Sequence, residues 1–319
     1  MAWGSPLLRL SAAVVALAGP ALAQTPPATP VAQTATPGHP PPGVAPDLAF
    51  AAYQRGYYLT AISEAKKRID ANDRAPAAMT LIGELYKEGL GVNEDAVEAA
   101  RWFKLGADSG DTEAAFSLAI AYLTGKGVEK SAEKAAPLLE KAAKAGHPAA
   151  LYQLGLQAMN GYIQDPAKAA GYFQRAMDAG DYDATYALAL AYKEGRGVEK
   201  DLTKAAAIMK QAADSRLSAA QVDYAIMLFN GEGAPADEAG AAKYFGLAAA
   251  ADNPVAMNRL ARLYAYGRGV KIDKVEAMKW HILARSAGVP DERLDEMLNT
   301  LGARDKVAVE DAVRKFAGK

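Results

Sequence analysis

Two short motifs in this chain carry the residue types of a serine nucleophile. Ser63 and Lys66, and again Ser131 and Lys134, have the spacing that lets a lysine assist a serine on one helical turn in penicillin-recognising enzymes. Those enzymes also need Ser-Asp-Asn and Lys-Thr-Gly elements, and neither occurs in this sequence. Ser131 stands shortly after a Gly-x-Gly turn, where a helix N-cap is expected. We therefore interpret both motifs as incidental and predict no catalytic residue.

The remaining residue types do not indicate a metal site, a phosphate-binding loop or another catalytic group. His147 opens a predicted helix beside Pro148, and His281 lies far from it in the sequence, so the two do not form a ligand set. With no cysteine the chain has no thiolate ligand or cysteine nucleophile. The Gly-x-Gly pairs follow predicted helices rather than strands and lack a Gly-Lys-Ser/Thr element, which indicates turns rather than phosphate cradles. No carboxylate pair stands out as an acid/base couple. We predict no metal and no cofactor.

Charge and hydropathy exclude two further classes of protein. The chain has 319 residues with 36 basic and 37 acidic side chains, a formal net charge of −1. A nucleic-acid-binding protein would show a basic excess to neutralise phosphates. The mean hydropathy of −0.09 argues against a polytopic membrane protein. We expect neither a nucleic-acid partner nor a membrane span in the mature chain.

The first 46 residues predict an export signal followed by a tether. Residues 1–23 combine Arg9, a short apolar run and the small-x-small pattern at Ala21 to Ala23, which predicts a signal peptide cleaved after Ala23. Residues 24–46 hold eight of the chain's 17 prolines, so we expect an extended linker there. The predicted location is the periplasm or the exterior of a bacterial cell.

A unit of about 36 residues recurs six times along the chain. The glycines that mark it are Gly89, Gly125, Gly161, Gly195, Gly231 and Gly267, spaced 36, 36, 34, 36 and 36 residues apart. Five of them are followed two positions later by a second glycine, whereas the third unit reads Gly161-Tyr162-Ile163 and has a loop two residues shorter. Alanine stands eleven residues before each, and only Gly or Ala stands six residues before it. Residues at these two positions lie on one side of an α-helix. The turn glycine then ends that helix.

A second alanine column, from Ala99 to Ala277, predicts a second helix in each unit, and no segment alternates with the period of a strand. The pattern Ala-x3-Leu-Gly-x2-Tyr-x2-Gly-x-Gly-Val, then Ala-x2-Trp-Phe, resembles the Sel1-like repeat, a relative of the tetratricopeptide repeat. The resemblance implies an all-α fold, a right-handed α-solenoid of six helix-turn-helix repeats over 75–288. Residues 47–74 resemble a tetratricopeptide-type hairpin, and we expect them and the helices of 289–319 to cap the solenoid.

A further column lies opposite the alanines on the first helix of each unit. Its members stand nine, five and two residues before the turn glycine: Phe116, Ile120, Leu123; Tyr152, Leu156, Met159; Tyr186, Leu190, Lys193; Val222, Ile226 and Phe229. Registered on the tetratricopeptide pattern, these positions face the concave side, which in that family often contacts ligands. Polar neighbours such as Glu113 and Asp183 could orient a peptide, and we expect Lys193, Asn258 and Arg262 to be exposed. Packing between adjacent first helices is the alternative interpretation.

The sequence therefore predicts a partner-binding site at Phe116, Ile120, Tyr152, Leu156, Tyr186, Leu190, Lys193, Asn258 and Arg262. The resemblance implies a non-catalytic adaptor of the bacterial cell envelope whose concave face holds a protein or peptide. Two alternatives stay open. One is an accessory protein or enzyme of the cell wall that recognises peptidoglycan, and the other is a secreted effector that acts on a host protein. The sequence leaves the partner's identity and the oligomeric state open.

Overall fold

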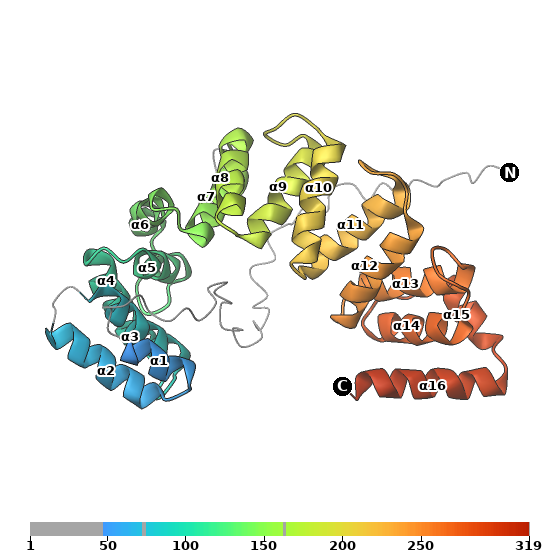
Figure 1. Ribbon diagram of the computed structural model, residues 1–319, viewed down its shortest axis with the longest axis horizontal. Coiled ribbons are helices and arrows are strands. Elements are labelled where there is room, and N and C mark those ends of the chain that lie inside the picture. Colours follow the sequence, from blue (N-terminus) through green and yellow to red (C-terminus); the bar gives the residue numbers. More distant parts are fainter. Residues whose placement is uncertain (1–46, 72–74, 162–163, 319) are drawn as a thin grey trace, which may run out of the picture. The chain divides into compact units, whose positions relative to one another are not determined.

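The computed structural model describes residues 47–71, 75–161 and 164–318 of the chain. These residues form sixteen α-helices and no strand, so the all-α prediction is confirmed (Figure 1). The predicted signal peptide (1–23) and linker (24–46) lie outside the described residues. No described helix is both long enough and apolar enough to cross a lipid bilayer.

Twelve of the helices form six consecutive pairs, each helix 13 residues long. The first helices of the pairs are α3 (Pro76–Glu88), α5 (Thr112–Thr124), α7 (Pro148–Asn160), α9 (Tyr182–Glu194), α11 (Ser218–Asn230) and α13 (Pro254–Tyr266). The second helices are α4 (Ala96–Asp108), α6 (Ala132–Lys144), α8 (Pro166–Asp178), α10 (Leu202–Asp214), α12 (Glu238–Ala250) and α14 (Lys274–Ser286). Preceding and following them are α1 (Leu48–Gln54), α2 (Tyr58–Ala71), α15 (Glu292–Asn299) and α16 (Ala303–Ala317).

The helices begin where side chains can satisfy their free N–H groups. Asp111 and Asp181 accept hydrogen bonds from Ala114 N and Ala184 N, as their positions predict for N-caps. Each second helix has an Asp or Ser cap, and these are Asp95, Ser131, Asp165, Asp201, Asp237 and Asp273. Proline at the first position of α3, α7 and α13 costs no hydrogen bond there.

The paired glycines have separate structural roles. Five first glycines end the first helices in a left-handed conformation; Gly161, with φ of −68°, departs from this. The second glycine also has positive φ and lies on the first residue of the preceding second helix. A Cβ at Gly127 would overlap the carbonyl oxygen of Ala96, and one at Gly269 would overlap that of Glu238. The turns therefore join one repeat to the next as well as ending a helix.

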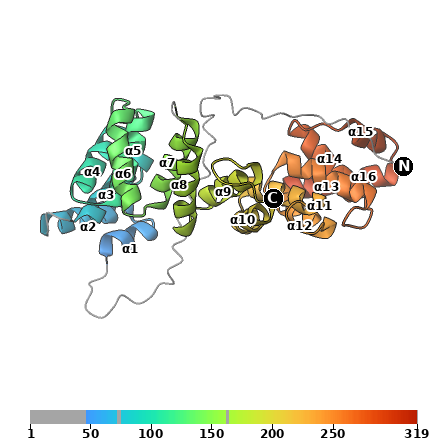
Figure 2. The same ribbon diagram turned by 90° about the horizontal axis from the view of Figure 1, so that it is seen from above.

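Alanine forms much of the buried core. All twelve members of the two alanine columns are at most 3 % exposed. Close approach also explains the glycines among the small residues of the first helices, because a Cβ at Gly83 would overlap the ring of Phe103. Each helix from α2 to α14 packs on the next one in the chain, and the two perpendicular views show this succession (Figure 2). The architecture is an α-solenoid, in which each pair buries its apolar faces on its neighbours.

Candidate partner-binding surface

The candidate site residues lie on the first helices, and we call the surface that they form the first-helix face. On α5, Glu113, Phe116 and Ile120 are spaced at i, i+3 and i+7, so they share one side of the helix. Asp183, Tyr186 and Leu190 of α9 have the same spacing. The face therefore repeats an acidic, an aromatic and an aliphatic position in these two repeats.

The aliphatic side chains of this face are neither fully buried nor fully exposed to solvent. Ile120, Leu156 and Leu190 are each half-buried, and the latter two pack against the main buried core. Part of each side chain therefore stabilises the solenoid, while the rest stays open to solvent. Apolar area at this position can be removed from water by a partner, which contributes about 25 cal/mol per Å² buried.

The aromatic positions make contacts within the solenoid, two of them with a neighbouring repeat. The Phe116 ring stacks on His147 of the next repeat with 4.7 Å between centroids, and Tyr152 packs at a tilt against Phe173. The Tyr186 hydroxyl donates to Asp223 Oδ2 of α11 at 2.7 Å. Burial, and then this hydrogen bond, raise the pKa of Tyr186 far above its ordinary value, so the phenol remains a donor. Phe116 and Tyr186 therefore pack between repeats, whereas Tyr152 packs on the second helix of its own repeat.

His147 links two repeats through both of its ring nitrogens. Its Nδ1 accepts from Ala150 N at 3.2 Å and caps α7, while Nε2 lies 3.0 Å from Glu113 Oε2. With Nδ1 accepting, the proton belongs on Nε2, which donates to the carboxylate. The hydrogen bond from His147 lowers the pKa of Glu113, although burial opposes it, so Glu113 is ionised at neutral pH. A negative charge is therefore fixed at the start of α5.

The polar candidates of α13 already have a partner within the chain. Asn258 Nδ2 donates to Asp291 Oδ2 at 3.2 Å, and Arg262 Nε donates to the same oxygen at 2.6 Å. Arg262 is exposed as expected, but the expectation for Asn258 is wrong, because it is 8 % exposed. Asp291 is itself buried and needs donors, and Asn258 supplies one. Lys193 also differs from the expectation, because it is half-buried, with its Nζ 4.0 Å from Glu232 Oε2.

Sequence reasoning missed one polar residue of this face. Asp223 stands eight residues before its turn glycine, where Ser117 stands in the second repeat, and Ser117 Oγ in turn donates to Glu84 of α3 at 3.2 Å. A polar residue between Val222 and Tyr224, both buried, was the available signal. A polar residue at this place in the helix indicates a side chain that points away from the core.

The residues tested for chemistry have structural partners. Ser131 Oγ accepts from Lys134 N as the N-cap of α6, and the Lys134 side chain is exposed. His281 is completely buried, and its Nε2 lies 2.9 Å from Asp295 Oδ1. Within the described ranges, no three His, Asp or Glu side chains are grouped to hold a metal ion.

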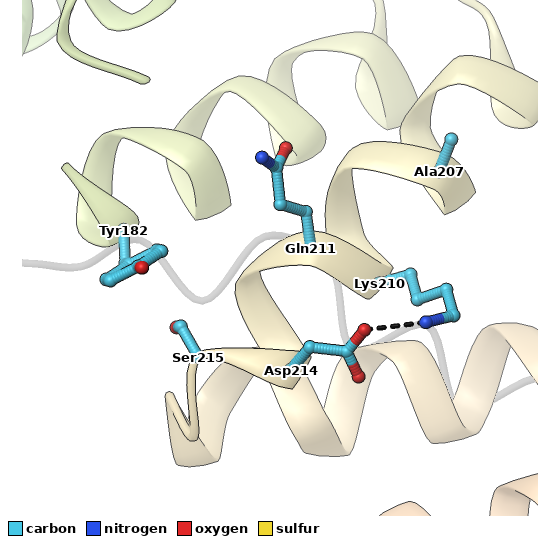
Figure 3. Close-up of a pocket in the computed structure, with 6 residues that line it drawn as sticks. All are labelled: Tyr182, Ala207, Lys210, Gln211, Asp214 and Ser215. Carbon is cyan, nitrogen blue, oxygen red and sulfur yellow. Dashed lines mark hydrogen bonds and ion pairs between the residues drawn. The ribbon is translucent and has the colours of Figure 1, made fainter. Parts of the chain in front are cut away.

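One pocket lies at the start of α9 and along α10, away from the predicted site (Figure 3). Its volume is about 410 Å³, and it is lined by Tyr182, Ala207, Lys210, Gln211, Asp214 and Ser215. Lys210 Nζ donates to Asp214 Oδ2 at 2.6 Å, and Asp214 Oδ1 accepts from the Tyr244 hydroxyl at 2.7 Å. The hydrogen bond from Lys210, followed by that from Tyr244, lowers the pKa of Asp214. An ionised carboxylate paired in this way is a poor general base at neutral pH.

Comparison with known proteins assigns the repeats. The Sel1 repeat model matches residues 76–111, 112–147, 148–181, 183–216, 218–253 and 254–289. A Sel1 repeat protein from Oxalobacter formigenes is 28% identical with a TM-score of 0.64, over 75% of this chain and 97% of that one. A protective antigen of uropathogenic Escherichia coli that displays an SLR fold is 24% identical with a TM-score of 0.53, over 85% of this chain and 68% of its own. No curated protein matches significantly.

The six matches fall on the six helix pairs, with their turn glycines and buried alanine columns. They cover most of the chain that the structure describes. The chain belongs to the Sel1 repeat family.

Proposed function

We propose that this chain is a non-catalytic adaptor of the bacterial cell envelope that holds a partner protein or peptide on the concave side of its solenoid, formed by the first-helix face. Sel1 repeats and the related tetratricopeptide repeats typically serve as scaffolds for protein–protein interaction. The observation that carries the proposal is the half-buried aliphatic column of Ile120, Leu156 and Leu190, which recurs in three consecutive repeats. A partner segment laid across the repeats would bury all three side chains together.

The envelope location rests on the sequence of residues 1–23, which has the features of a cleaved signal. The absence of cysteine is compatible with this location, because a chain without cysteine cannot form incorrect disulfides in an oxidising compartment. N-terminal sequencing of the mature protein purified from cells reads Gln24 as its first residue if cleavage follows Ala23.

The test is crosslinking capture in intact cells, comparing the wild type with an Ile120→Glu/Leu190→Glu variant. We expect the wild type to capture one defined envelope protein and the variant to lose it, because two charges replace apolar contact area. Phe116 and Tyr186 are unsuitable for this test, since their contacts with His147 and Asp223 support the fold. Circular dichroism checks that the variant keeps its helical content.

The matched control is Val97→Glu/Leu105→Glu on α4. These side chains are 53% and 48% exposed, so the control makes the same chemical change on a second helix. We expect it to capture the partner as the wild type does. Retention of the partner by a folded Ile120→Glu/Leu190→Glu variant would place the site elsewhere. Capture of peptidoglycan fragments without any protein would contradict the adaptor proposal itself.

A further inference from the structure

The first and second helices of the repeats differ in charge. The first helices α3, α5, α7, α9 and α11 together carry six acidic and two basic side chains, a net charge of −4. The second helices α4 to α12 of the same five repeats carry seven acidic and ten basic side chains, a net charge of +3. The near-zero charge of the whole chain therefore conceals a net negative charge on these five first helices, while the aspartate N-caps Asp95, Asp165, Asp201 and Asp237 offset the basic excess within the second helices.

The acidic groups lie beside the aliphatic column. Glu113 and Asp183 are exposed at the second position of α5 and α9, seven residues before Ile120 and Leu190, which places each pair on one side of its helix. Asp223 lies on α11, one repeat after Asp183 and four repeats after Glu84. The first helices of the second, fourth and fifth repeats thus carry an acidic side chain, whereas that of the third repeat contributes Leu156 without an acid.

Two of these carboxyl groups, those of Glu113 and Asp223, each have one oxygen in a side-chain hydrogen bond within the chain. The hydrogen bond from His147 uses Glu113 Oε2, and the hydrogen bond from Tyr186 uses Asp223 Oδ2. Both donors can be neutral groups, so neither hydrogen bond needs to cancel the negative charge. The basic side chains of these first helices, Lys87 and Lys193, pair with Glu84 and Glu232 rather than with these acids.

We propose that the first-helix face binds a cationic amphipathic segment, whose Lys or Arg side chains meet Glu113, Asp183 and Asp223 while its apolar side chains cover Ile120, Leu156 and Leu190. The inference rests on the proposed binding function and adds the partner's chemistry. Complementary charge selects such a segment and accelerates its encounter, whereas an acidic segment or an anionic membrane is repelled. The sign reverses at Arg259 and Arg262 of α13, so the cationic part of the segment spans the second to fifth repeats.

The test measures fluorescence anisotropy of labelled peptides with the full chain. The probe is a Leu–Lys peptide of about 14 residues with its leucines at helical spacing. One comparison peptide has Glu for Lys, and the other has Ser for Leu. We expect the Leu–Lys peptide to bind at least about tenfold more tightly than either comparison peptide, and its affinity to fall between about 50 and about 300 mM NaCl. Equal binding of the Leu–Glu peptide would overturn the proposal.

The protein variant is Glu113→Gln/Asp183→Asn/Asp223→Asn, which removes three charges but keeps oxygens that can accept from His147 and Tyr186. We expect the Leu–Lys peptide to bind it about tenfold more weakly than the wild type. The control Glu133→Gln/Glu140→Gln/Asp178→Asn removes three exposed charges from α6 and α8, and we expect less than about a twofold change. Equal losses in the two variants would mean a nonspecific charge effect and would reject the proposal.

The capture experiment separates this inference from the proposed function. Suppose that Ile120→Glu/Leu190→Glu loses its partner while the carboxamide variant keeps it. The face then binds a protein, but the proposed partner chemistry is wrong. Loss of the same partner in both variants, together with binding of the Leu–Lys peptide, supports both statements. Retention of the partner in both variants contradicts this inference and places the binding site away from the first-helix face.

Discussion

The second glycine of a turn is fixed by two requirements that can be separated experimentally. Gly197 has φ of +76°, and a Cβ there would also overlap the carbonyl oxygen of Pro166. Gly195, two residues earlier, has φ of +75°, but its Cβ would approach Lys200 no closer than 3.2 Å. Gly195 therefore isolates the cost of the backbone conformation, while Gly197 adds the cost of the contact.

We expect Gly197→Ala to destabilise the protein more than Gly195→Ala. The left-handed conformation costs an alanine about 1–2 kcal/mol at either position. At Gly197 the overlap with Pro166 adds about 1–3 kcal/mol, because two backbones must move apart. Urea denaturation followed by circular dichroism measures both variants, and equal losses of stability would contradict the contact seen at Gly197.

The burial of single residues shows what the sequence could predict and what it could not. Ala78 and Ala256 were placed in the core because an uninterrupted column of small residues has helical spacing, and both are buried. Asn258 was misplaced because its partner, Asp291, lies 33 residues away and meets it only after α15 has folded back onto α13. Columns indicate which residues share a face, whereas burial also depends on what covers that face. The binding role of the first-helix face stays a prediction for the same reason.

Among the elements, α15 contacts the last repeat through two carboxylates as well as through apolar side chains. Asp291 caps it and accepts from Asn258 and Arg262 of α13, and Asp295 accepts from His281 and Arg285 of α14. Leu294 is the one fully buried apolar residue within the helix as described. Burial raises the pKa of Asp291, but Arg262 and Asn258 outweigh it and lower the pKa overall. His281, then Arg285, lower that of Asp295.

We expect α15 to loosen in acid before the central repeats do. Both carboxyl groups have folded pKa values below their ordinary 3.8, so they stabilise the folded state above that pH. Their contribution is lost as the pH falls through the lower folded values. Hydrogen–deuterium exchange, corrected for intrinsic rates, should rise in α15 relative to α9 between about pH 5 and about pH 3. An Asp295→Asn variant should exchange faster at the higher pH and change less with acid; an unchanged ratio in the wild type would contradict this account.

At the scale of the whole repeat array, the junctions are unequal. Ala96, Pro166, Leu202 and Glu238, which lie under a second glycine, are half-buried, whereas their counterpart Ala132 in the second repeat is exposed. The next turn along the chain is the one with Ile163 in place of that glycine and two fewer residues. In addition, α6 packs less extensively on α7 than the other second helices do on the first helices that follow them. The junction between the second and third repeats is therefore stabilised by less extensive packing than the other junctions between repeats.

We expect the array to open first at this junction, since the stability of a solenoid is roughly a sum of repeat and interface contributions. Replacing Gly161–Asp165 with the sequence of Gly195–Asp201 restores the second glycine and the full loop length. Hydrogen exchange at the start of α6 should be faster than at the start of α8 in the wild type, and the loop replacement should slow it. A replacement that leaves the exchange at α6 unchanged would show that the turn does not determine the strength of the junction.

In four turns the second glycine, namely Gly127, Gly197, Gly233 or Gly269, lies against a backbone carbonyl, and this has a consequence for how such a protein can evolve. Ala, Pro, Leu and Glu all occupy the covered position, at Ala96, Pro166, Leu202 and Glu238, because the glycine touches no group that distinguishes them. A gene can therefore gain or lose a repeat by unequal recombination, and the new neighbours still fit. Recombination would then change the length of the array, whereas point mutation changes the side chains that its first helices present.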